Sequence, residues 1–190
     1  MTFPPIVFQL PVSSAARILL IVVVTIAAIY DLRFRRIPNW LVLAALILGI
    51  GLNTVLFELT GLRYSLLGLG LAFLVYFPLY LLRGMGAGDV KLMAAIGSIM
   101  GPVNWFVIFV ITAILGGLAA IALLIGRNQL HRGLSNVASL VVELLSFRPP
   151  YARNEELDVT SRKSLKLPHG IVIAWGSVLF LVASWIWAPR

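Results

Sequence analysis

Long stretches without a charged side chain are the feature that most constrains this sequence. They cover 18–30, 37–57, 64–82, 92–126 and 167–189. A helix needs about 20 apolar residues to cross a bilayer, so three of these runs each fit one span. The chain is 61% hydrophobic and 12% charged, whereas soluble domains average about 45–50% and about 25%. These values exclude a soluble enzyme and predict an all-α, polytopic membrane protein.

The other two runs need adjustment before the spans can be counted. Run 18–30 is too short for a bilayer, so its helix must extend back past Arg17, whose long side chain can reach the interface. Run 92–126 is too long for one helix, and Gly101-Pro102 signals a break within it. We therefore expect a short helix up to that break and a full helix after it. The sequence thus predicts six transmembrane helices in a single membrane domain covering 1–190.

The basic residues indicate the orientation of these spans. A net charge of +8 can indicate nucleic-acid binding, but in a membrane chain it is typical of cytoplasmic loops that are rich in Lys and Arg. Six alternating spans place the loops 31–36, 83–91 and 127–166 on one side. Of the 15 Lys and Arg residues, the other side holds only Arg17, Arg63 and Arg190. We therefore expect the basic side to be cytoplasmic and both termini to lie outside.

Segment 127–166 is the only sizeable polar part of the chain. Within it, apolar residues recur at helical spacing, at Leu134, Val137, Ala138, Val141, Val142 and Leu145. This pattern predicts an amphipathic helix on the membrane surface within a cytoplasmic loop. We interpret the segment as a tether.

Two aspartates fall at predicted span ends on the cytoplasmic side. Asp31 ends the first span and Asp89 begins the fourth. Ionisable groups beside hydrocarbon are costly and are often functional. Taken singly, each has a structural interpretation: Asp31 as a flanking charge paired with Arg33 or Arg35, and Asp89 as a helix N-cap. Because the topology brings both to one interface, together they predict an acid–base pair.

The surroundings of the two aspartates form a pattern that resembles a known family. Asp31 is followed by Ile37-Pro38-Asn39, where Pro38 suits the first turn of a helix. Asp89 follows Gly86-Ala87-Gly88 and precedes Val90-Lys91-Leu92. This arrangement resembles the type IV prepilin peptidases, which are membrane aspartyl proteases with a Gly-x-Gly-Asp motif. The stretch 167–170, Leu-Pro-His-Gly, is also similar to the family.

The resemblance implies roles for particular residues. Asp31 and Asp89 match the two catalytic aspartates, and Gly86 and Gly88 match the loop glycines. Lys91 matches a basic residue after the motif, which is either an interface anchor or a charge that tunes Asp89. With the Pro38-Asn39 pair, these flanking residues are candidates for substrate binding or loop support.

The sequence also departs from the larger members of that family. Those members carry a cytoplasmic domain between the first two spans, often with zinc-binding cysteines, and they also methylate the new N-terminus. Here only a few residues separate Asp31 from Ile37, and the chain has no cysteine. It therefore resembles the short form associated with Flp/Tad-type pili. The resemblance leaves methyltransferase activity unassigned and implies no metal and no cofactor.

Peptide hydrolysis by two carboxylates requires one ionised and one protonated group, which close like charges favour. The ionised group takes a proton from water and the other hydrogen-bonds the substrate carbonyl. The resemblance implies a prepilin or prepilin-like substrate with a basic leader and a hydrophobic helix. Cleavage would occur after a glycine at the cytoplasmic boundary of the bacterial inner membrane. The sequence indicates neither the base nor the oligomeric state.

Two alternatives from other classes stay open. The first is a small proton-coupled transporter with Asp31 and Asp89 as a proton relay. It predicts polar residues deep in several spans, and Ser98 is the main inner candidate. The second is a non-catalytic assembly scaffold of a pilus or secretion system.

Overall fold

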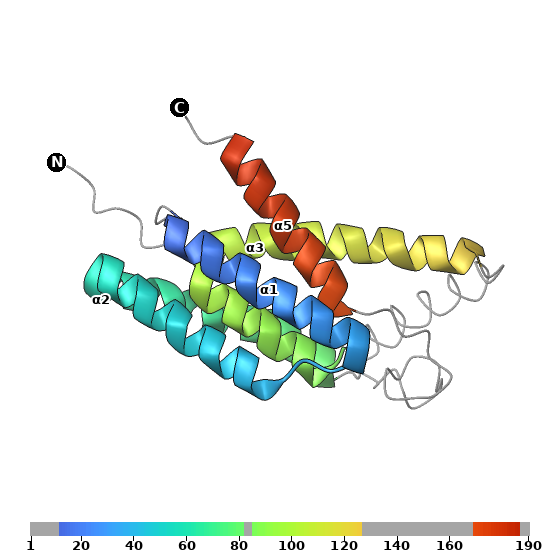
Figure 1. Ribbon diagram of the computed structural model, residues 1–190, viewed down its shortest axis with the longest axis horizontal. Helices are drawn as coiled ribbons and strands as arrows, with labels where there is room; N and C mark the ends of the chain where they lie inside the picture. The colour runs from blue at the N-terminus through green and yellow to red at the C-terminus, as the bar shows by residue number, and fades with distance from the viewer. Residues whose placement is uncertain (1–11, 82–84, 127–168, 187–190) are drawn as a thin grey trace.

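In the computed structural model, the described residues are 12–81, 85–126 and 169–186. Within them the chain is helical, with α1 (Ser14–Phe34), α2 (Asn39–Leu81), α3 (Ala87–Gly126) and α5 (His169–Ile186) (Figure 1). All four helices are long and apolar enough to cross a membrane. The predicted helical class is therefore confirmed. The expected surface helix in 127–166 lies outside the described residues.

The helix count differs from the six separate helices expected from the sequence. α2 covers the expected spans 37–57 and 64–82, and Glu58 is the one residue between them with a non-helical backbone (φ 52°, ψ −137°). The Asn53 side chain donates to Ser65 Oγ at 2.9 Å across that break, so the two parts of α2 lie side by side. The turn needs no loop, which is why two expected spans form one helical element.

α3 contains the break predicted at Gly101-Pro102. Gly101 has φ 70° and ψ 178°, which glycine adopts readily because it has no Cβ. The ring of Tyr64 also occupies the place where a Cβ at Gly101 would lie. In Figure 1 the two parts of α3 diverge from this break. Both breaks therefore lie at one end of the bundle.

Polar side chains satisfy the backbone groups that the break in α3 leaves open. Pro102 has no N–H for the carbonyl of Ser98, four residues before it. The Asn53 amide donates instead to the carbonyls of Ser98 and Ile99, both at 3.1 Å. The hydroxyl of Tyr64 donates to the carbonyl of Met100. These bonds hold the breaks of α2 and α3 together.

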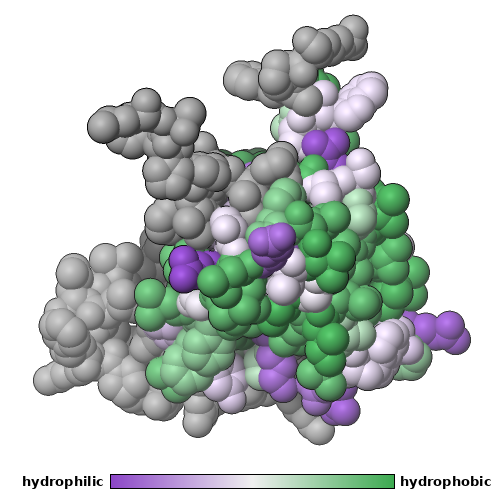
Figure 2. Space-filling view, turned by 90° about the vertical axis from the view of Figure 1, so that its left-hand side faces the viewer, coloured by the Kyte–Doolittle hydropathy of each residue, from purple (hydrophilic) through white to green (hydrophobic). Residues whose placement is uncertain are grey.

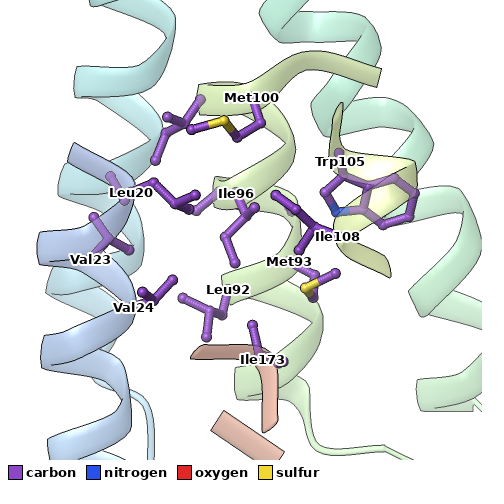
Figure 3. Close-up of a cluster of buried hydrophobic side chains, with 14 of the residues drawn as sticks. Leu20, Val23, Val24, Leu92, Met93, Ile96, Met100, Trp105, Ile108 and Ile173 are labelled. Atoms are coloured by element: carbon purple, nitrogen blue, oxygen red, sulfur yellow. The ribbon is translucent and has the colours of Figure 1, made fainter. Parts of the chain in front are cut away.

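The first part of α3 is the centre of the bundle. Its side chains from Leu92 to Gly101 are all buried, which is typical of a helix surrounded by others. Figure 3 shows α1 and α5 packing onto it, for example through Leu20 and Ile173. Asp89 stands at the start of this central segment.

The outer surface is strongly apolar. Val55, Leu74 and Trp185 are 83%, 70% and 72% exposed, and Figure 2 shows large hydrophobic areas on the face it presents. A monomeric soluble protein rarely exposes contiguous patches of that extent. Such a surface is typical of a protein embedded in a lipid bilayer.

Ser13 is the N-cap of α1, and its side chain accepts the N–H of Ala16 at 3.1 Å. The helix includes Arg17, as the adjusted run 18–30 predicted. Its buried residues form one stripe along the helix, at Ala16, Leu20, Val23, Val24, Ala27 and Asp31. Asp31 therefore continues the face of α1 that packs against the core.

Candidate active site

Asp31 lies near the C-terminal end of α1 and is 8% exposed. Its Oδ2 atom accepts the backbone N–H of Gly170 at 2.9 Å. Gly170 is the second residue of α5, where the helix presents free N–H groups and the positive end of its dipole. The start of α5 therefore presents a hydrogen-bond donor to the Asp31 side chain.

The contact between Asp31 and Gly170 requires glycine. A Cβ at residue 170 would lie 2.9 Å from both Cβ and Oδ2 of Asp31, which is closer than such atoms approach. Gly170 begins the buried face of α5, which continues through Ile173, Gly176, Ser177, Phe180 and Leu181. Packing of this buried face therefore places Gly170 against α1.

Asp89 is the third residue of α3 and is half-buried. Its backbone N–H donates to the carbonyl of Gly86 at 3.1 Å, and its side chain accepts the backbone N–H of Gly86. The side-chain contact is one half of a capping box, in which the third helical residue reaches back to the cap; Gly86 has no side chain to supply the other half. Asp89 therefore lies inside the helix. The alternative interpretation of the sequence, in which Asp89 is the N-cap residue, is wrong.

The structure brings the two aspartates together although they are far apart in the sequence. Asp31 and Asp89 lie close enough for their negative charges to interact. Figure 1 shows the end of α1 and the starts of α3 and α5 at the same end of the bundle. The charges of two residues that are 58 positions apart in the sequence therefore act on one another at this end of the bundle.

The flanking motif residues tie the starts of α2 and α3 to each other. Ile37 packs against Gly88, where an added Cβ would lie 3.3 Å from Ile37 Cβ. Lys91 Nζ donates to Asn39 Oδ1 at 3.1 Å. Pro38 directly precedes the first residue of α2, and its carbonyl accepts the N–H of Val42 at 3.4 Å, so it stands at the start of the helix. These contacts position the turn that carries Asp89.

Sequence reasoning assigned no site role to His169 and Gly170. The structure places both beside Asp31, since Gly170 donates to it and His169 interacts with it electrostatically. The one available signal was the sequence 167–170, Leu-Pro-His-Gly, at the start of the last apolar run. Within the described residues, no three His, Cys, Asp or Glu side chains gather as metal ligands would.

The sequence profile of the type IV leader peptidase family matches residues 18–121, which is more than half of the chain. The chain belongs to the type IV leader peptidase family. No curated protein and no solved structure matches the chain. The segment shared with the leader peptidases includes Asp31, the Gly86–Asp89 turn and Lys91, but it ends before α5. The contact of α5 with Asp31 therefore comes from the structure of this leader peptidase and not from the family match.

Proposed function

We propose that this leader peptidase is an aspartyl endopeptidase that removes the leader from prepilin or prepilin-like proteins, with Asp31 and Asp89 as its catalytic pair. The observation that carries the proposal is the meeting of the two carboxylates at one end of an apolar helical bundle. Each carboxylate is held by a backbone N–H, from Gly170 and Gly86 respectively. These two amides give each carboxylate a defined position, which supports their use as a pair.

The chemistry needs no covalent intermediate. The ionised carboxylate takes a proton from a water molecule, whose oxygen attacks the scissile carbonyl carbon. The protonated carboxyl hydrogen-bonds the carbonyl oxygen and then supplies the proton that the leaving amine requires. Collapse of the tetrahedral intermediate breaks the C–N bond and releases the leader as a carboxylic acid.

The substrate class follows from where the pair lies. A polar cleavage site must reach the end of the bundle while an apolar helix stays in lipid beside it. Prepilin-type proteins have this form, with a basic leader before a hydrophobic segment. The short connection from α1 to α2, through Arg35 and Arg36, supports the Flp-type form of the enzyme because it leaves no room for an inserted domain.

A proton-relay transporter is less compatible with the interior. The residues of α3 from Leu92 to Gly97 are apolar and buried, and they separate Asp89 from Ser98. The Ser98 hydroxyl donates to the carbonyl of Ala95 at 2.8 Å, so it is used within its own helix. In the described part of the chain, the polar cluster of Asn53, Ser65 and Ser98 therefore stabilises the breaks rather than extending the acidic site.

The direct test is cleavage by the full-length protein in lipid vesicles. The substrate is a synthetic peptide with a basic leader, a glycine before the scissile bond and an apolar helix. We expect a shorter product whose new N-terminus begins directly after the glycine, as read by mass spectrometry. A peptide with Trp in place of that glycine is the matched control. A correctly inserted protein that leaves both peptides intact would refute the proposal and favour the scaffold.

We further propose six passes through the bacterial inner membrane, with both termini outside and the aspartates on the cytoplasmic side. α2 has 43 residues and α3 has 40, so each would measure about 60 Å if straight, twice the roughly 30 Å of a bilayer core. Their breaks at Glu58 and Gly101 let each helix cross twice. The excess of basic residues on the side of Asp31 supports the orientation.

The chain contains no cysteine, which gives a clean test of this topology. We expect Arg63→Cys to react with a membrane-impermeant thiol reagent from outside the cell, and Asn154→Cys to react only after the membrane is opened. Arg63 is exposed close to the break at Glu58 in α2, whereas Asn154 lies outside the described residues. Labelling of both variants from the same side would rule out six passes.

A further inference from the structure

Tyr76 in α2 is a buried polar side chain to which the proposed reaction assigns no role. It is 3% exposed, and its ring packs edge-on against Trp105 at 6.1 Å and Phe109 at 5.7 Å between centroids. Two aromatic neighbours from the second part of α3 therefore fix the plane of the phenol. A tyrosine buried in this way ordinarily finds a polar partner for its hydroxyl.

The packing register of α2 and α3 identifies that partner. The second part of α2 runs antiparallel to the first part of α3. Tyr64 lies against Gly101, and Gly68 lies against Gly97 with backbone touching backbone. Residues that follow one another toward the C-terminus of α2 therefore face residues that lie progressively closer to the N-terminus of α3.

Continuing the register leads to the candidate site. Tyr76 lies about two turns beyond Gly68, and Asp89 lies about two turns before Gly97, so the two face each other. The close approach at Gly97, where an added Cβ would lie 3.1 Å from Ala72 Cβ, keeps the helices near enough for contact. The Tyr76 side chain lies within electrostatic range of Asp89.

We propose that Tyr76 is a positioning residue for Asp89: when substrate binds, its hydroxyl forms a hydrogen bond to the Asp89 carboxyl group and holds it toward Asp31. This rests on the proposed peptidase function and deepens it. Asp31 is held from α5 through Gly170, whereas Asp89 is held from α2 through Tyr76 and from its own turn through Gly86. The two carboxylates then stand in different surroundings: Asp31 lies against the start of α5, and Asp89 lies in the first turn of its own helix, beside the Tyr76 phenol.

The test is Tyr76→Phe in the full-length protein, assayed with the same glycine-containing peptide in vesicles. Phe keeps the ring and its packing and removes only the hydroxyl. We expect kcat to fall about tenfold or more, as for loss of a hydrogen bond to a charged group, with KM and the Tm in detergent unchanged. Tyr80→Phe is the matched control, since Tyr80 is 43% exposed one turn further along α2 and should keep parental kcat.

Any other result for the Tyr76 variants contradicts the proposal. A parental kcat would show that the hydroxyl does not act on Asp89, and a raised KM with unchanged kcat would make Tyr76 a substrate contact instead. If the variant has a lowered Tm, difluorotyrosine at position 76 keeps the packing and alters only the hydroxyl's acidity. An unchanged kcat there would leave Tyr76 as a packing residue. If Asp31→Asn and Asp89→Asn are inactive and Tyr76→Phe is fully active, only the role of Tyr76 is refuted. If the Asn variants are active, the proposed peptidase function is refuted.

Discussion

Asp31→Asn and Asp89→Asn are each expected to reduce prepilin cleavage by at least about 10²–10⁴-fold, while the protein still inserts with all its spans. That range is typical of one general acid or base, and Asn keeps the size of the side chain without its ability to exchange a proton. Because Asp31 and Asp89 share one site, we expect the double variant to be no worse than either single one. The measurement is the converted fraction of a co-expressed prepilin, read by gel shift and confirmed by N-terminal sequencing.

Two comparisons sharpen that experiment. Glu58→Gln makes the same carboxylate-to-amide change at the opposite end of the bundle, where Glu58 is exposed, and should process the substrate normally. Asp→Glu at either site keeps the charge but moves the carboxyl by about an ångström, which can cost about 10²-fold. If Asp31→Asn cleaves at the parental rate, the two-aspartate mechanism must be abandoned.

Gly170→Ala is expected to have an effect of similar size. The new methyl group would lie 2.9 Å from Cβ and Oδ2 of Asp31, so the carboxylate must move away from the N–H that holds it. A displacement of about an ångström corresponds to a loss of about 10²-fold in kcat/KM. Alanine also favours a helix over glycine by about 1 kcal/mol, so weakening of α5 would not explain such a loss.

A matched control for this change is Gly70→Ala, because a Cβ at residue 70 meets nothing within 4 Å. It should cleave at the parental rate. Both variants are compared by initial cleavage rate and by Tm in detergent. Parental activity in Gly170→Ala at an unchanged Tm would mean that the amide of residue 170 does not position Asp31.

Much of the fold could be predicted because charge and backbone chemistry mark it directly. Gly101-Pro102 indicated a break because glycine permits its backbone angles and proline lacks an N–H. Glu58 bounded an apolar run, so its charge located the turn in α2. The sharpness of that turn was not predictable, since a helix that reverses at one residue with φ 52° carries no local sequence signal.

The candidate site could be predicted only where its residues stand in a motif. Asp31 and Asp89 were identified as a pair because span counting brings them to one boundary, and the structure places their charges within reach of each other. Their catalytic roles stay a prediction. Gly170 and Tyr76 were missed for one reason: their positions depend on how α5 and α2 pack against other helices. No spacing within a single segment encodes such a register.

The bond between Asp31 and Gly170 joins the first helix to the last one. During synthesis, a chain that has inserted α1, α2 and α3 already contains both carboxylates, yet Asp31 still lacks the amide that orients it. Only arrival of α5 completes the arrangement. An unfinished chain in the membrane therefore carries both aspartates before Asp31 has its amide partner from α5.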